Sequence, residues 1–133
     1  MKRFCLVLIL LIISIAPGTG LHASEEGAAA VVQTLFKFMQ EGNTNAILEL
    51  FTDPILAQKR DQLENSRAYS KFLIDTYAKS SMVISRVEHL SESETIVDVE
   101  FRFPNGDPPL KTRFVTNNHE GPWKIAFEKI IGQ

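Results

Sequence analysis

The chain has 133 residues, of which 44% are hydrophobic and 23% are charged, and its formal net charge is −2 at pH 7. These values are typical of a globular protein, and one domain of about 100–150 residues accounts for most of the length. The 14 lysines and arginines are scattered along the sequence, which excludes the concentrated positive surface of nucleic-acid-binding proteins and of polybasic membrane anchors.

The first 23 residues match the pattern of a secretory signal peptide. Lys2 and Arg3 precede an uncharged and almost wholly apolar run over 4–13, and Ala23 is a small residue suited to a cleavage site. The run is shorter than the ~20 apolar residues that a membrane-spanning helix needs. We therefore predict cleavage after Ala23, a single mature domain over 24–133, a periplasmic or secreted location, and no stable membrane span after cleavage.

Removal of this segment would change the charge and the cysteine content. Cys5 is the only cysteine and lies before the apolar run, whereas a lipoprotein signal carries its cysteine after the run, so we do not expect lipid attachment. The mature chain would then have no disulfide and no thiolate ligand for a metal. Without Lys2 and Arg3, 12 basic residues remain against 16 acidic ones, which gives a net charge of −4.

Helical periodicity dominates the first half of the predicted domain. Apolar residues recur at helical spacing over 24–41, with Ser24 as the expected N-cap and Gly42 at the end of the helix. Thr44 or Asn45 is expected to cap a short second helix.

A third helical stretch is predicted directly after it. Asp53 is the expected cap, and Pro54 suits the first helical position because its missing N–H has no helical partner there. Helical character continues to about Lys79, with a break at Asn65–Ser66.

The apolar period changes from 3.6 residues to 2 at Ser80. The alternating segments that follow are separated by turns rich in Gly, Pro, Asn and Ser, and they predict strands over 82–90, 95–103, 110–115 and 123–131. Helices followed by a four-stranded antiparallel meander predict an α+β domain with its helices packed on one face of the sheet.

Two segments resemble the nuclear transport factor 2-like superfamily, which has a cone-shaped, cystatin-like fold. They are Gly-Asn-x-x-x-Ile-Leu-x-Leu-Phe over 42–51, with Asp53 just after it, and Gly-Pro-Trp-Lys-Ile over 121–125. The chain is most similar to small exported bacterial members of unknown function. The resemblance implies a curved sheet but no single activity, because this fold hosts isomerases, dehydratases, cyclases, ligand binders and interaction modules.

Enzymes of this superfamily use an Asp, His or Tyr inside the cone, so the resemblance makes Asp53, Tyr69 and Tyr77 the catalytic candidates. An aspartate before a proline at a helix start is also an ordinary cap, and that is the preferred interpretation of Asp53. His89 and His119 stand 30 residues apart without a paired ligand, so we predict no metal and no cofactor.

Charged residues alternate with apolar ones in the second predicted strand. The apolar face suits packing against the helices, so Asp98, Glu100 and Arg102 are expected on the convex face of the sheet. Lys111 and Arg113 on the next strand would pair with them in a solvated ladder. Such a face disfavours a large dry dimer interface, and we expect a monomer or a homodimer.

Aromatic residues at these spacings usually form core, but a cone can leave a cavity that they line. The expected pocket residues are Phe72, Phe101, Phe114, Trp123 and Phe127. The sequence thus favours an exported, non-enzymatic domain that binds a small apolar ligand or a protein of the cell envelope. The alternatives are a small isomerase- or dehydratase-like enzyme, and an accessory module of an envelope or secretion complex.

Overall fold

A computed structural model describes residues 19–132 of the protein, and their side chains from Glu25 onward. The predicted signal peptide lies almost wholly outside this part, so it stays a prediction. Within residues 19–132, four helices precede four strands: α2 (Thr19–Glu41), α3 (Thr44–Leu48), α4 (Asp53–Leu63), α5 (Arg67–Tyr77), β1 (Ser81–Ser91), β2 (Glu94–Arg102), β3 (Leu110–Asn117) and β4 (Lys124–Gly132). The strands form one antiparallel sheet in the order β1-β2-β3-β4, which confirms the α+β prediction.

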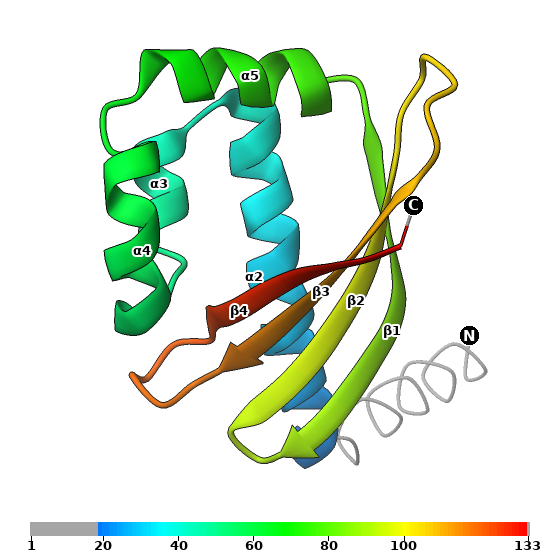
Figure 1. Cartoon of the computed structure of the whole chain (residues 1–133). Helices are drawn as coiled ribbons and strands as arrows, with labels where there is room; N and C mark the ends of the chain where they lie inside the picture. Colours follow the sequence, from blue (N-terminus) through cyan, green and yellow to red (C-terminus); the bar gives the residue numbers. More distant parts are fainter. Residues whose placement is uncertain (1–18, 133) are drawn as a thin grey trace, which may run out of the picture.

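The helices cover one face of the curved sheet (Figure 1). Helix α2 runs along this concave face and contacts all four strands, while α5 crosses above its upper end and α3 and α4 stand beside it. None of the described helices is both long enough and apolar enough to cross a membrane.

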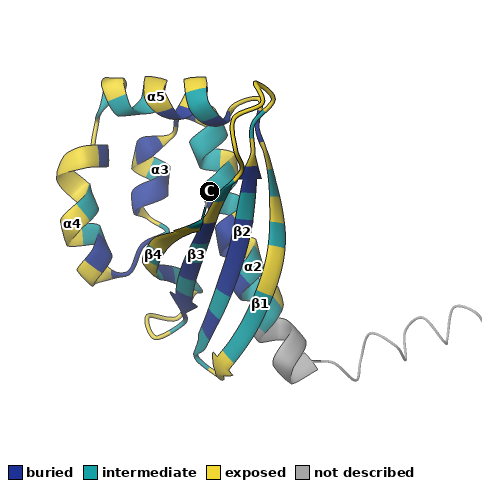
Figure 2. Cartoon of the chain, turned by 45° about the vertical axis from the view of Figure 1, so that its right-hand side comes forward, coloured by how far each residue is buried: buried dark blue, intermediate teal, exposed yellow. Residues whose placement is uncertain are grey.

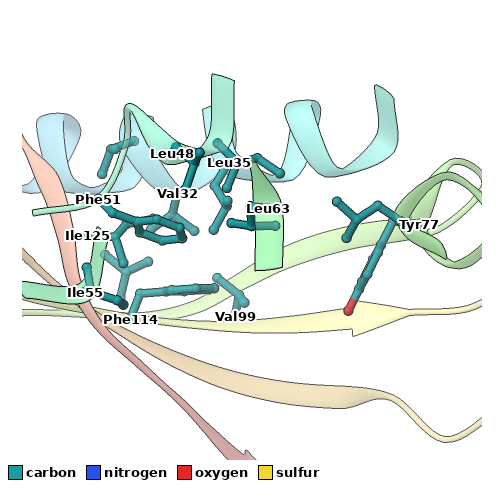
Figure 3. Close-up of a cluster of buried hydrophobic side chains, with 14 of the residues drawn as sticks. Val32, Leu35, Leu48, Phe51, Ile55, Leu63, Tyr77, Val99, Phe114 and Ile125 are labelled. Atoms are coloured by element: carbon teal, nitrogen blue, oxygen red, sulfur yellow. The ribbon is translucent and has the colours of Figure 1, made fainter. Parts of the chain in front are cut away.

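The core lies between α2, the short helices and the middle strands β2 and β3, where buried residues concentrate (Figure 2). Figure 3 shows part of this cluster, with Phe51, Ile55, Phe114 and Ile125 gathered at one end and Tyr77 at the other. The outer faces of α4 and α5 are exposed, and α4 buries only Ile55 and Leu63.

The helix starts differ from the sequence prediction in three places. Helix α2 begins at Thr19 and continues through Ser24, so Ser24 is not its N-cap. Asn43, rather than Thr44 or Asn45, caps α3 by accepting a hydrogen bond from the backbone N–H of Ala46. The left-handed backbone of Gly42, at φ +66°, places Asn43 in this position.

The cap of α4 is Thr52, whose side chain makes no capping hydrogen bond, and Asp53 is the first helical residue. The prediction of Asp53 as the cap was therefore wrong by one position. The break before α5 is confirmed, because Asn65 has a positive φ of 54° and Ser66 caps α5.

A β-bulge in β4 changes which side chains face the helices. Ile125 lies opposite Thr116, but Phe127 lies opposite Val115, so Ala126 is an extra residue in the strand. Because one extra residue reverses the alternation of the strand, Phe127 points to the convex face. Glu128, opposite Phe114, turns to the concave face instead.

The predicted convex charge ladder is present only in part: Asp98 pairs with Arg113 across the strands, whereas Lys111 makes no ion pair among the described residues. One member is also not solvated as predicted. Asp98 is only 5% exposed. It accepts hydrogen bonds from Arg113 across the β2–β3 pairing, and Arg86 of β1 lies 3.9 Å from its carboxylate. The two long arginine side chains cover the carboxylate, which explains its burial. Glu100 instead bonds Arg102 on its own strand, at 3.1 Å.

Candidate functional site

A cavity of about 580 Å³ lies between the concave face of the sheet and the helices. Its volume falls within the ~300–1,000 Å³ of typical small-molecule sites. Most of its wall is apolar, contributed by α2, α3, α5 and the inward residues of β2 and β3. Phe72 and Ile130 line it although they are 52% and 60% exposed, so the cavity opens to solvent beside α5 and β4.

Two tyrosines of α5 supply hydroxyl groups to this wall. They are eight residues apart, which places them on the same side of the helix. The Ser66 cap fixes the start of α5 by accepting a hydrogen bond from the backbone N–H of Tyr69, at 3.1 Å. The Tyr77 ring packs edge-on against Phe101, with ring centres 5.4 Å apart.

Burial raises the pKa of both tyrosines above the usual value. For Tyr69, Lys59 partly opposes this shift and Glu128 adds to it. For Tyr77, the neighbouring Tyr69 and Glu128 both add to the effect of burial. The hydroxyls therefore stay protonated at neutral pH, which leaves each with a proton available for donation. Within the described part of the chain, no protein group forms a hydrogen bond with either hydroxyl.

Lys59 of α4 and Glu128 of β4 form an ion pair of 2.5 Å in the cavity wall. Their side chains are 28% and 31% exposed, so solvent screens the pair only in part. The pair joins the weakly buried helix α4 to the edge strand β4.

The sequence analysis missed both members of this pair. Regular alternation from Trp123 places Glu128 on the convex face, and only the bulge at Ala126 reverses this. The adjacent apolar residues Ile130 and Ile131 were a sign that the strand does not alternate throughout. Lys59 gave no comparable signal, because α4 is polar over most of its surface.

The predicted site residues separate into two groups. Five of them line the cavity together: Tyr69, Phe72, Tyr77, Phe101 and Phe114. The other three lie outside its wall: Asp53, Trp123 and Phe127.

Each of these three has a different position. Asp53 is exposed at the start of α4, where its backbone N–H donates to Glu120 at 3.4 Å. The Trp123 ring covers Gly27 of α2, where a Cβ would lie 2.3 Å from its Cδ1 atom. Phe127 is 51% exposed on the convex face.

His89 and His119, the two histidines whose side chains are described, lie apart from each other and outside the cavity wall. His89 is opposite Thr95 in the β1–β2 pairing, and His89 Nδ1 and Thr95 Oγ1 are both buried without a hydrogen-bond partner. His119 Nε2 lies 3.2 Å from Ser93 Oγ in the exposed turns. Among residues 25–132, no three His, Cys, Asp or Glu side chains gather as a metal site.

Two solved structures have a similar fold. One is an NTF-2-like protein of unknown function from Shewanella oneidensis, with a TM-score of 0.56 and 10% identity over 79% of this chain and 96% of that one. The other, from Silicibacter pomeroyi, is also an NTF-2-like protein of unknown function, with a TM-score of 0.53 and 17% identity over 85% and 98%. No protein-family model and no curated protein matches the sequence. The chain therefore has the NTF-2-like fold, as the two sequence segments predicted.

Proposed function

We propose that the protein is exported and that its mature domain binds a small, mainly apolar molecule in the cavity. The observation that carries this proposal is that the aromatic side chains line the cavity instead of filling it. Phe72 and Ile130 leave more than half of their surface exposed at this site, and a bound apolar molecule would remove that surface from water.

The protonation of the two tyrosines and the ion pairing of Glu128 support binding without catalysis. The raised pKa values of Tyr69 and Tyr77 make them poor bases near neutral pH. Glu128 is the only carboxylate in the described cavity wall, and Lys59 already pairs with it.

The test is native mass spectrometry of the protein purified gently from the periplasm or culture medium of a bacterial host. We expect a polypeptide mass corresponding to 24–133 and an additional small apolar molecule. Leu110→Trp places a larger side chain in the cavity wall and should abolish retention of that molecule. Phe127→Trp makes a similar change on the convex face and should not.

Three results would count against the proposal. An uncleaved mass in the exported fraction would contradict the signal peptide. A ligand retained equally by both variants would contradict the cavity as its site. If a protein is retained in place of a small molecule, the envelope-partner alternative is favoured.

The same wall supports a second candidate, an enzyme that uses Glu128 for proton transfer. The Glu128 carboxylate raises the pKa of both tyrosines through its charge. The protonated tyrosine hydroxyls are suited to stabilising a negative charge that develops on a substrate. If the co-purified molecule changes chemically during incubation with the protein, and Glu128→Gln stops the change, catalysis is established. An unchanged molecule supports binding alone.

A further inference from the structure

The polar groups of the cavity are few, and their states differ. Tyr69 and Tyr77 each offer a protonated hydroxyl with no protein partner among the described residues. Lys59 and Glu128 are engaged with each other. The remainder of the wall is mainly aliphatic and aromatic, including Leu35, Phe51 and Phe114. Thr112 adds a third hydroxyl, but it is 7% exposed, whereas the tyrosine hydroxyls are the larger polar groups of the wall. The cavity therefore presents hydroxyl donors and one neutralised ion pair.

The two tyrosine hydroxyls act in one region of the cavity. Tyr69 influences the ionisation of Tyr77, and Glu128 influences that of both, so the three groups lie within electrostatic reach of one another. The apolar cluster around Phe51 and Phe114 lies at the end away from Tyr77 (Figure 3). The Tyr77 side chain thus lies at the opposite end of this cluster from Phe51 and Phe114.

A charged ligand group would be poorly matched to this arrangement. A carboxylate would meet Lys59 already paired with Glu128, and an ammonium group would meet Glu128 already paired with Lys59. Lys129 also borders the cavity, but it is exposed and lies opposite Arg113 in the β3–β4 pairing, so its side chain projects to the convex face. Either ligand ion would therefore lose its hydration in a mainly apolar cavity without an inward-facing counter-charge, which is costly.

A pure hydrocarbon would also be poorly matched. It would cover both tyrosine hydroxyls, exclude their water and offer no acceptor in return. Burial of a hydroxyl group without a hydrogen-bond partner weakens ligand binding. A ligand oxygen that accepts from the hydroxyl restores the lost hydrogen bond.

We propose that the cavity selects an electrically neutral, mainly apolar molecule that carries an oxygen acceptor, such as a ketone, ester or alcohol, and that Tyr69 and Tyr77 donate to this oxygen. The inference rests on the proposed function, because it names the class of ligand that the same cavity binds. The apolar part of the molecule lies against the wall formed by Leu35, Phe51 and Phe114.

The test compares four probes that each contain twelve carbon atoms: methyl decyl ketone, dodecane, dodecanoate and dodecylamine. Each is titrated below its aggregation concentration against the protein loaded with a fluorescent apolar dye. We expect the ketone to bind tighter than dodecane by roughly three- to tenfold per hydroxyl engaged. The two charged probes should bind about tenfold more weakly than the ketone, or worse.

The variants Tyr69→Phe and Tyr77→Phe, and the double variant, keep the ring and remove only the hydroxyl. The preference for ketone over dodecane should shrink in each single variant and disappear in the double variant. Thr76→Val is the matched control, because it removes a hydroxyl from the same helix outside the cavity wall. It should leave the preference unchanged, and thermal unfolding verifies that every variant is folded.

A second readout does not depend on the dye. Because the protein has only two tyrosines, the ultraviolet titration of tyrosinate reports on these hydroxyls alone. A ligand oxygen that accepts from the protonated hydroxyl should raise the tyrosine pKa values further, whereas a ligand bound elsewhere should not.

The outcomes separate this inference from the function on which it rests. Equal binding of ketone and dodecane, insensitive to the tyrosine variants, overturns the inference and leaves apolar binding intact. Preferred binding of dodecanoate that is lost in Lys59→Met also overturns it. If neither dye nor any probe binds to the folded protein, the proposed function itself fails.

Discussion

Asp98 and Arg113 form a two-point ion pair across β2 and β3, on the face of the sheet opposite the helices. Arg113 donates to the two carboxylate oxygens at 2.8 and 3.0 Å, in the bidentate geometry that only a guanidinium group provides. The side chain of Asp98 is 7% exposed and that of Arg113 is 35% exposed. The carboxylate is therefore buried mainly by its own partners.

Removing Arg113 should consequently destabilise the protein more than its partly exposed position indicates. Arg113→Met keeps much of the aliphatic cover but leaves Asp98 buried with only the distant Arg86. A buried carboxylate that has lost its partner is strongly unfavourable, so we expect a loss of stability clearly larger than that of an exposed ion pair. Urea denaturation measures the change.

Lys111→Met on the same strand is the control, because Lys111 is exposed and makes no ion pair within the described residues. It should change the free energy of unfolding by less than about 0.5 kcal/mol. Equal effects of the two substitutions would mean that the Asp98–Arg113 pair contributes little to stability.

The tyrosines should make stability fall at alkaline pH. Their folded pKa values are raised above the ordinary value of about 10, so the folded state retains these protons after the unfolded state has lost them. Their contribution is fully present below about pH 10 and is lost as the pH rises through the folded pKa values. Tyr69→Phe or Tyr77→Phe should therefore reduce the alkaline loss of stability, measured by urea denaturation across this range. A variant that loses stability as steeply as the native protein would contradict the shift.

The ion pair in the cavity wall should affect these two titrations in opposite directions. Glu128→Gln removes a negative charge that raises both pKa values, so both tyrosines should ionise at lower pH. Lys59→Met removes a positive charge that lowers the pKa of Tyr69, so Tyr69 should ionise at higher pH. The tyrosinate absorbance of each variant checks the sign. Shifts in the same direction would show that the charges do not act on the cavity as the structure indicates.

Phe114 and Phe127 both stand in alternating strand segments, but replacing each by alanine should lower the free energy of unfolding by very different amounts. Phe114 is 2% exposed in the core, so Phe114→Ala should cost about 3–5 kcal/mol. Phe127 is half-exposed on the convex face, and Phe127→Ala should cost less than about 1 kcal/mol. Comparable losses in chemical denaturation would mean that Phe127 is buried in solution.

These two residues also explain how far the sequence could predict the site. The strands, turns and helix break were predictable, since alternation, Gly-Asn and Pro-rich turns and the Ser66 cap are local signals. The inward position of Phe101 and Phe114 followed from the regular alternation of β2 and β3. Phe127 and Glu128 could not be placed, because the bulge depends on the pairing of β4 with β3 and leaves only a weak trace in the sequence.

The contact between Gly27 and Trp123 is a long-range feature of the same kind, and Gly27→Ala tests it. Alanine favours a helix over glycine by about 1 kcal/mol, so an open position would be stabilised. Here the new Cβ would lie 2.3 Å from the indole ring, and displacing the ring should cost about 1–3 kcal/mol. We expect a net loss of stability in urea denaturation. The emission of Trp123, the only tryptophan, should also shift towards that of an exposed indole.

The double variant with Trp123→Leu gives the matched comparison for this contact. Without the indole ring, Gly27→Ala should stabilise the protein by about the helix propensity difference, so the sign of its effect should reverse. If Gly27→Ala stabilises the native protein and leaves its emission unchanged, Trp123 does not hold α2 against the start of β4. Reversal of the sign would assign Trp123 to anchoring helix α2, a role separate from the cavity.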